Sequence, residues 1–265
     1  MRVTVLGTGM IGKVIVKELA LLPGITHVVA VDGQQAAVDA CLAFAGSAKV
    51  EGRVADLGAP DVLVDVMTGS DAAIAALPHA LSLSAVEAAI QAKCHLVDLV
   101  GSRYPEKVAL HERARAAGIL VVVGCGVAPG LLNVLTARGV ELLDEAEEAI
   151  MYCGGLPRHP QPPLWYQVVF RLESVVGLYT RPALALEQDA LVERPPLSGL
   201  EACTFPEPVG ECEAVYSDAH SVAYTLRGKV RRLSEKTVRF KGHFAKMGVL
   251  AELGFLSDEP VNVDG

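Results

Sequence analysis

The sequence predicts an α/β protein: a doubly wound parallel Rossmann sheet, followed by a second α+β domain with a mainly antiparallel sheet. Three observations carry this prediction. A glycine-rich turn joins the first strand to the first helix, strand and helix patterns alternate six times before about Gly126, and proline-separated short runs follow Pro129-Gly130. We expect a dinucleotide-binding domain over 1–128 and a substrate and oligomerisation domain over 129–265.

The first strand, expected at Val3–Leu6, runs into Gly7-Thr8-Gly9-Met10-Ile11-Gly12, which has the spacing of the dinucleotide-binding motif. In this motif Gly7 permits a tight turn, Gly9 lets the backbone approach a pyrophosphate, and Gly12 lets the helix pack closely on the strand. The start of the helix then presents N–H groups to the phosphates. We therefore expect residues 7–12 to bind the cofactor, the alternative being an ordinary glycine-rich turn.

The second strand, expected at Val28–Val31, ends in Asp32, which lies 20 residues after Gly12. A carboxylate at this place accepts hydrogen bonds from an adenosine ribose diol and repels a 2′-phosphate. Because Gly33 follows it, and not an arginine or serine, the sequence favours NAD over NADP.

The remaining elements of the first domain follow from apolar runs and helical periodicity. Strands are expected at Lys49–Val54, Ala72–Ala76, His95–Leu99 and Ile119–Val123. Helices are expected at about Ile11–Leu22, Gln34–Ala45, Ala59–Thr68, Ser84–Ala92 and Glu106–Ala117. Pro105 suits the first turn of the last helix, and Gly118 suits its end.

In the second domain, a helix through about Leu142 precedes several short alternating runs. Strands are expected at Glu148–Tyr152, Gln167–Leu172, Ala183–Leu186, Val222–Leu226 and Thr237–Phe240. A final helix is expected from Phe244 to Leu253, with Gly254 as its stop.

Composition excludes several classes of protein. Of the 265 residues, 51% are hydrophobic and 20% charged, which is typical of a globular chain, and the net charge of −8 argues against a nucleic-acid partner. No run approaches the ~18 apolar residues of a membrane helix, and the start of the chain has no secretory pattern, so we expect a cytoplasmic protein. The six cysteines show no metal-ligand spacing, so we expect reduced thiols and no metal.

Candidate chemical groups of the first domain follow its strands, because ligands of open α/β sheets collect beyond the carboxyl ends of the strands. Ala76-Leu77-Pro78-His79 follows the fourth strand, where the small Ala76 lets the cofactor lie across the strand end. Asp98 ends the fifth strand and could bind an ammonium group, or cap a helix. His79 is equally well explained as a loop histidine. Asp56 could approach the adenine or cap its own loop, and Cys125 is better explained as a small apolar filler than as a nucleophile.

Two segments of the second domain carry candidate groups, Tyr179-Thr180-Arg181-Pro182 and Arg239-Phe240-Lys241-Gly242-His243. An arginine fork suits a substrate carboxylate, and a histidine can exchange protons near neutral pH. The alternative for either arginine is an ordinary surface ion pair.

The chain resembles the saccharopine dehydrogenase-like family over nearly its whole length, and within it the branch of L-lysine 6-dehydrogenases. The resemblance rests on the segments VTVLGTGMIG, AALPHALSLSAVEAAIQAKCHLVDLVG, GCGVAPGLLNVL, YCGGLP, YTRPA and TVRFKGHFAKM. It implies NAD-dependent oxidative deamination of the 6-amino group of L-lysine, giving 2-aminoadipate 6-semialdehyde, ammonia and NADH.

The resemblance also implies roles for individual residues. Asp98 is expected in the amine region, His79 or His243 in proton transfer, Arg181 and Arg239 at the substrate carboxylate, and Tyr179 in the pocket wall. It further implies a homo-oligomer, with a dimer as the expected form, a second domain shortened at its carboxyl end, and a helix over 243–253 that returns toward the first domain. The alternatives are an oxidoreductase acting on saccharopine or another amino acid, and a non-catalytic NAD-binding module.

Overall fold

The computed structural model describes residues 1–168, 172–257 and 259 of the chain. The chain divides into two compact units, residues 1–131 and 132–265, which are described separately below. Within the described residues, no helix is both long and apolar enough to cross a membrane.

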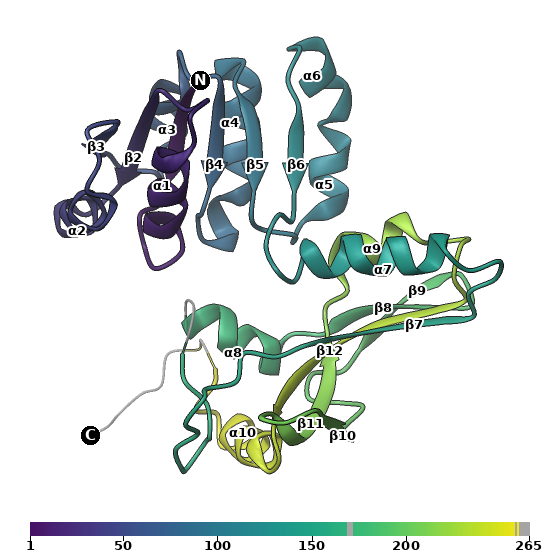
Figure 1. The fold of residues 1–265 in the computed structure, drawn as a ribbon. Coiled ribbons are helices and arrows are strands. Elements are labelled where there is room, and N and C mark those ends of the chain that lie inside the picture. Colours follow the sequence, from purple (N-terminus) through teal and green to yellow (C-terminus); the bar gives the residue numbers. More distant parts are fainter. Residues whose placement is uncertain (169–171, 258, 260–265) are drawn as a thin grey trace. The chain divides into compact units, whose positions relative to one another are not determined.

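Unit 1 is built on a six-stranded parallel sheet with the strand order β3-β2-β1-β4-β5-β6 (Figure 1). Its strands are β1 (Arg2–Leu6), β2 (His27–Asp32), β3 (Val50–Val54), β4 (Ala72–Ala75), β5 (His95–Asp98) and β6 (Val121–Val123). Its helices are α1 (Gly12–Leu21), α2 (Gln35–Ala45), α3 (Pro60–Met67), the short 3₁₀ helix η1 (His79–Leu81), α4 (Ser82–Ala92), α5 (Tyr104–Ala109) and α6 (His111–Ala116). The predicted doubly wound sheet is confirmed.

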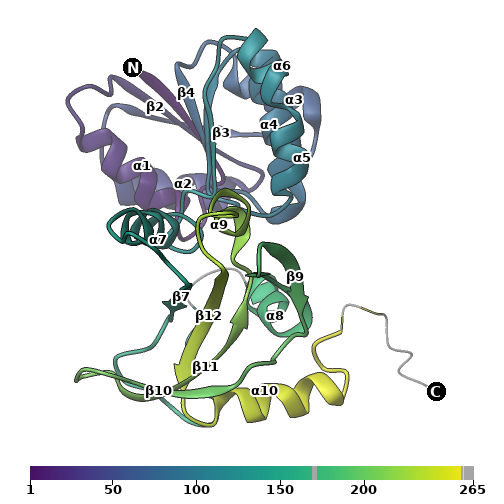
Figure 2. The same ribbon diagram turned by 90° about the vertical axis from the view of Figure 1, so that its right-hand side faces the viewer.

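Helices cover both faces of this sheet, which explains why its strands are mostly apolar, except for the edge strand β3. The helices α1 and α2 pack on Val3, Val5 and Val28, whereas α3, α4 and α6 pack on the opposite face (Figure 2). The predicted helix Glu106–Ala117 is instead two helices, α5 and α6, with a break at Leu110.

Unit 2 contains a second, mixed sheet centred on β12 (Arg232–Phe240). Along one side, β12 pairs in parallel with β7 (Glu148–Cys153). Along its other side it pairs antiparallel with β8 (Ala183–Glu187) at its first two residues and with β11 (Gly210–Ser217) over the rest. The outer strands are β9 (Ala190–Arg194), which pairs with β8, and β10 (Glu201–Phe205), which pairs with β11. The expected mainly antiparallel sheet is confirmed.

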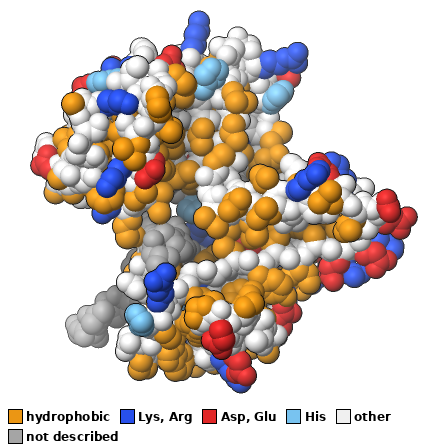
Figure 3. Space-filling model, viewed as in Figure 1, with side chains coloured by type: hydrophobic (Ala, Val, Ile, Leu, Met, Phe, Trp, Pro, Cys, Tyr) orange, Lys and Arg blue, Asp and Glu red, His pale blue; other side chains and the backbone are white. Residues whose placement is uncertain are grey.

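Four helices accompany this sheet, α7 (Leu131–Glu141), α8 (Leu172–Thr180), α9 (His220–Thr225) and α10 (His243–Glu252). Residues of α7 and α9 pack with Met151 and Leu233 at one end of the sheet, and residues of α8 and α10 pack with Val215 at the other. Acidic side chains gather on the surface where α7 is followed by β7, namely Asp144, Glu145, Glu147 and Glu148 (Figure 3).

Of the predicted strands of unit 2, Val222–Leu226 was wrong, and Gln167–Leu172 lies partly outside the described residues. Val222–Leu226 lies mainly in the helix α9, because its alternation comes from three apolar residues that pack as one helical face with Leu186 and Leu233. Of the predicted strand Gln167–Leu172, residues 169–171 lie outside the described residues, 167–168 lie in no strand, and Leu172 begins α8. The strands β9, β10 and β11 were not predicted.

Candidate functional site

The glycine-rich loop of unit 1 has the close contacts that the motif requires. Gly7 has a φ of 88°, and a Cβ built on it would lie 2.5 Å from the Ala76 carbonyl oxygen, while a Cβ on Gly12 would overlap the Gly7 carbonyl. Around Gly9 there is no atom within 4 Å of a built Cβ. The loop therefore keeps its shape through Gly7 and Gly12 and presents open space at Gly9, which fits the approach of a pyrophosphate.

Asp32 ties this loop to the end of β2. Its Oδ2 accepts hydrogen bonds from the Thr8 backbone N–H at 2.8 Å and the Thr8 hydroxyl at 3.2 Å, and its Oδ1 accepts from the Gln34 N–H at 3.1 Å. No lysine or arginine of the described residues forms an ion pair with Asp32. The lone pairs of its carboxylate that remain can accept hydrogen bonds from ribose hydroxyls.

The other expected cofactor residues lie around the same strand ends. Met10 and Ile11 are exposed, and the Ala76 N–H donates to the Leu6 carbonyl, next to the loop. Leu77 is buried and Pro78 half-buried before η1. Asp56 is exposed, and its carboxylate accepts the Gly58 N–H at 2.9 Å, so the structure shows it capping its own loop.

His79 and Ser102 join the ends of β4 and β5. His79 Nδ1 and Ser102 Oγ are 3.0 Å apart, and both side chains are half-buried. Ser102 was not among the predicted residues, and it fixes the orientation of the imidazole.

Asp98 is fully buried and binds an ammonium group of the chain itself. Its carboxylate accepts hydrogen bonds from Lys107 Nζ at 2.8 Å, Ser82 Oγ at 2.6 Å and the Val100 N–H at 3.0 Å. Lys107 Nζ also donates to the Val100 carbonyl at 2.7 Å. The pair therefore anchors the loop that carries Ser102 onto α5.

Lys107 was missed by the sequence analysis, although its position contained a signal. With Leu110 and Ala114 it forms a stripe spaced by three and four residues, the spacing of an inward helix face. A lysine at an inward position needs a buried carboxylate, because an unpaired buried charge is strongly unfavourable.

The six cysteines are all free thiols. Burial raises the pKa of the Cys125 thiol, with the charge of Asp98 adding to the effect, so the thiol stays protonated at neutral pH. This property fits the small apolar filler better than a nucleophile.

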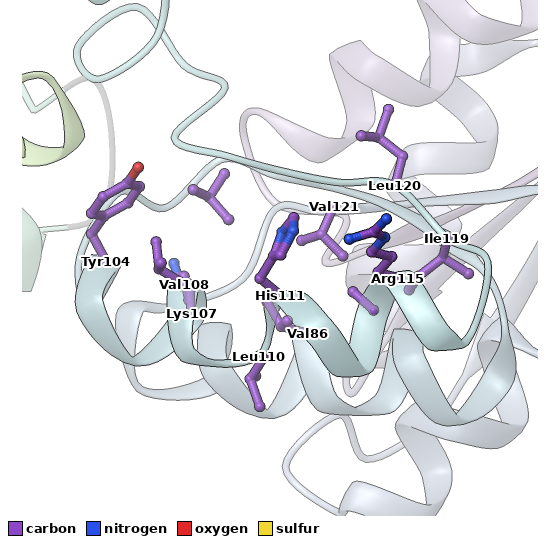
Figure 4. A pocket seen from close by; sticks show the side chains of 12 residues that line it. Val86, Tyr104, Lys107, Val108, Leu110, His111, Arg115, Ile119, Leu120 and Val121 are labelled. Atoms are coloured by element: carbon purple, nitrogen blue, oxygen red, sulfur yellow. The ribbon is translucent and has the colours of Figure 1, made fainter. Parts of the chain in front are cut away.

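A pocket of about 340 Å³ lies beside β6, between this strand and α5 and α6 (Figure 4). Tyr104, His111 and Arg115 come from the helices, and Leu120 and Val121 face them from the strand side. Because β6 is three strands away from β1 in the sheet, this pocket is separate from the glycine-rich loop.

In unit 2, the structure brings three predicted residues together: Tyr179, Arg239 and His243, each at most 2% exposed. Arg239 Nε donates to the Tyr179 hydroxyl at 3.1 Å, and this hydroxyl lies 3.0 Å from His243 Nε2. His243 Nδ1 lies 2.9 Å from the Leu164 carbonyl, which can only accept, so Nδ1 carries the proton and Tyr179 donates to Nε2.

Both ring nitrogens of His243 are therefore occupied by the protein. Burial lowers the pKa of His243, and the charge of Arg239 lowers it further. The hydrogen bond to the Leu164 carbonyl opposes this effect but does not reverse it, so the imidazole is neutral at pH 7. This arrangement leaves neither nitrogen for a substrate and makes His243 a support for Tyr179.

The Arg239 guanidinium stacks on the Tyr166 ring at 4.6 Å and has no carboxylate partner among the described residues. Glu213, directly across on β11, instead accepts the Phe244 N–H at 2.8 Å. A buried guanidinium without an acid is suited to binding an anionic group. Arg181 is exposed after α8, with its guanidinium folded back over Gly177, and does not join this cluster.

Within the described part of the chain, no group of three or more His, Cys, Asp or Glu side chains is placed to hold a metal ion. The chemistry of both units therefore depends on the dinucleotide loop, the partnered polar groups at the strand ends of unit 1, and the cationic cluster of unit 2.

Comparison with known proteins matches both units to one family. Residues 3–122 match the saccharopine dehydrogenase NADP binding domain, and residues 126–264 match the saccharopine dehydrogenase C-terminal domain. A curated relative, saccharopine dehydrogenase [NADP(+), L-glutamate-forming] of Pyricularia oryzae, is 27% identical over 202 residues, which are 71% of this chain and 44% of the relative. The chain thus spans less than half the length of this relative.

The same fold is found in the apo saccharopine dehydrogenase (L-Glu forming) of Saccharomyces cerevisiae. The TM-score is 0.77 at 20% identity, covering 97% of this chain and 59% of the yeast protein.

Proposed function

The chain belongs to the saccharopine dehydrogenase family, and from this membership we propose that it is an oxidoreductase that uses NAD to deaminate the 6-amino group of L-lysine. C6 of the substrate transfers a hydride to NAD and water hydrolyses the resulting imine, so the products are 2-aminoadipate 6-semialdehyde, ammonia, NADH and a proton. The single observation that carries the proposal is the open space at Gly9 beside Asp32, in a loop held by Gly7 and Gly12.

The cofactor is held by the loop 7–12 and by Asp32, with Ala76, Leu77 and Pro78 along the neighbouring strand end. When bound, its nicotinamide ring supplies the hydride acceptor. The N–H groups at the start of α1 bind the pyrophosphate, and Asp32 binds the adenosine ribose.

The choice of NAD rests on Asp32, which has no cationic partner among the described residues. The names of the matched domain and of the Pyricularia relative specify NADP. Kinetics with each nucleotide test this choice: we expect kcat/KM to be at least tenfold higher with NAD, and a preference for NADP would contradict the role given to Asp32.

In unit 2, Arg239 binds the substrate carboxylate, and Tyr179 and His243 hold its guanidinium in place. The exposed Arg181 is a weaker candidate for this role, because it is free to move in solvent and lies outside the buried cluster.

In unit 1, His79 accepts the proton that the substrate amine releases, and Ser102 orients the imidazole of His79. We assign Asp98 a positioning role: it holds the loop that carries Ser102. It does not bind the substrate amine, because Lys107 already occupies its carboxylate. The orientation of the reacting groups makes a large contribution to the rate of hydride transfer. Asp98 therefore supports the reaction through the loop that it anchors, without contacting the substrate.

Incubation with L-lysine and NAD, followed at the NADH absorbance band, tests the proposed reaction. NADH formation with stoichiometric ammonia supports it. Turnover of saccharopine and not of lysine would favour the second candidate, a saccharopine oxidoreductase, to which the names of both relatives point. Tight NAD binding without turnover of any amine would identify a non-catalytic module.

A further inference from the structure

Glu235 of β12 is a buried carboxyl group with an unused oxygen. The residue is 5% exposed, its Oε1 lies 3.4 Å from the Ser217 hydroxyl, and its Oε2 has no hydrogen-bond partner among the described residues. A buried polar atom without a partner costs about 1–3 kcal/mol, and more if charged, so it needs an explanation.

Among the described residues, no neighbouring group forms a hydrogen bond with the Oε2 of Glu235, although the charge of His220 acts on the carboxylate. His220 is engaged by Asp218, whose carboxylate lies 3.1 Å from His220 Nδ1 and accepts the His220 N–H at 2.9 Å. From β7 comes the neutral thiol of Cys153, opposite Thr237. No lysine or arginine of the described residues forms an ion pair with Glu235.

Glu235 and Arg239 lie on the same face of β12, because side chains alternate along a strand and the two are four residues apart. In the part of the chain that the structure describes, Glu235 is a buried acid with an oxygen that makes no hydrogen bond, and Arg239 is a buried guanidinium that pairs with no acid. They form no ion pair with each other, and their Cα atoms lie about 13 Å apart along the strand, with Thr237 between them. Both would be satisfied by one ligand that carries an anion at one end and a cation at the other.

We propose that Glu235 binds the distal ammonium group of a diaminocarboxylate whose carboxylate binds Arg239, and that Glu235 thereby selects substrates with a second amine. This inference rests on the proposed function, which requires an amino acid of this kind. An extended lysine spans about 8 Å between its charged ends, which is less than the Cα separation. Arg239 Nη1 donates to Thr237 Oγ1 at 3.3 Å, so the guanidinium reaches back along β12 toward Glu235 and shortens the gap that a ligand has to span. Simple α-amino acids, with both charges on neighbouring atoms, cannot reach both groups.

Titration calorimetry with three probes tests the proposal: L-lysine, L-norleucine, which lacks the distal amine, and 1,5-diaminopentane, which lacks the carboxylate. The wild-type protein is expected to bind lysine at least tenfold more tightly than either analogue. Glu235→Gln is expected to abolish the preference for lysine over norleucine while leaving norleucine affinity unchanged. The matched control is Glu211→Gln, which removes the same charge from an exposed position on β11 that pairs with the exposed Lys241.

Retention of the lysine preference in Glu235→Gln would overturn the proposal. If this variant does not fold, the wild type itself gives the answer: the preference for lysine over norleucine must rise between pH 6 and pH 8 as Glu235 ionises beside Asp218 and His220, and a constant preference would overturn it. Burial raises the pKa of Glu235 to about 7, with Asp218 adding to the effect and His220 and Ser217 opposing it.

The calorimetric result is separate from the reaction. Lysine that binds with the expected preference but yields no NADH would contradict the proposed function alone. If lysine is turned over and Glu235→Gln keeps the preference for lysine over norleucine, only this inference is contradicted. If lysine binds neither to the free protein nor to the protein saturated with NADH, the proposed function and this inference are both contradicted.

Discussion

Thr8 and Asp32 share one carboxylate oxygen: Asp32 Oδ2 accepts both the backbone N–H and the hydroxyl of Thr8. The acid that ends β2 thus holds the glycine-rich loop that follows β1. A single side chain therefore shapes the glycine-rich loop and is also the residue that we propose for binding the adenosine ribose.

Replacing Asp32 by alanine removes both functions. We expect Asp32→Ala to weaken NAD binding by at least about 100-fold, because two hydrogen bonds from the ribose to a charged acceptor are lost, each worth about 1.5–3 kcal/mol. Fluorescence titration with NADH measures the effect. Asp39→Ala, which removes an exposed carboxylate of α2 that accepts a hydrogen bond from Gln35, is the control. Unchanged affinity in Asp32→Ala would show that the ribose binds elsewhere.

Two glycines of the loop should respond in opposite ways to a methyl group. A Cβ at Gly9 meets no atom, so Gly9→Ala should keep its thermal stability but lose at least tenfold in NAD affinity. A Cβ at Gly12 overlaps the Gly7 carbonyl, so Gly12→Ala should lower the free energy of unfolding by about 1–3 kcal/mol. Gly24→Ala, also in open space, serves as the control. Normal NAD binding by Gly9→Ala would place the pyrophosphate away from this loop.

The sequence was sufficient for the fold of unit 1 because each local signal there agrees with the sheet. The strands of a parallel sheet are apolar throughout, and the glycine motif marks the first turn. In unit 2, β10 and β11 carry Glu201, Glu211 and Glu213, which obscure their apolar pattern. Their pairing also depends on β12, because β10 pairs with β11 and β11 pairs with this strand. Val222 and Leu226 show the other limit, since three apolar residues fit either a strand or a helical turn.

Among the candidate site residues, the sequence identified Tyr179, Arg239 and His243 but not their connection. The hydrogen bond from Arg239 to Tyr179 joins residues 60 positions apart, and no local pattern predicts it. The partner of Asp98 was missed for another reason: a lysine inside a helix usually lies in solvent, and only the inward position of Lys107 signals its burial.

The buried pair of Asp98 and Lys107 should matter more for folding than any surface ion pair. Lys107→Met leaves Asp98 buried without its cation and should lower the free energy of unfolding by about 3–5 kcal/mol. The double variant Asp98→Asn with Lys107→Met removes both charges and should recover at least half of this loss. Urea denaturation measures both variants. Arg115→Met, which removes an exposed cation of α6, is the control, and a Lys107→Met variant as stable as this control would contradict the role of the pair.

The raised pKa of Glu235 predicts a stability that depends on pH even without a ligand. Burial raises this pKa from its usual 4.5 to about 7, and Asp218 adds to the effect while His220 and Ser217 oppose it. Between these two pH values the folded state binds the proton more tightly than the unfolded state, so the free energy of unfolding falls as the pH rises through this window. Glu235→Gln does not titrate. Its stability relative to wild type should therefore rise by on the order of 3 kcal/mol between pH 4 and pH 8.

Urea denaturation of both proteins across this pH range measures the difference, in which the contributions of all other titrating groups cancel. The new contacts of the glutamine change the difference in stability by an amount that does not depend on pH. Only the change of this difference with pH therefore reports on the Glu235 carboxyl group. A difference that stays level from pH 4 to pH 8 would mean that Glu235 ionises in the folded protein as easily as in the unfolded chain. Its unpartnered oxygen would then already be satisfied by solvent, and the selection of a second amine by Glu235 would lose its energetic basis.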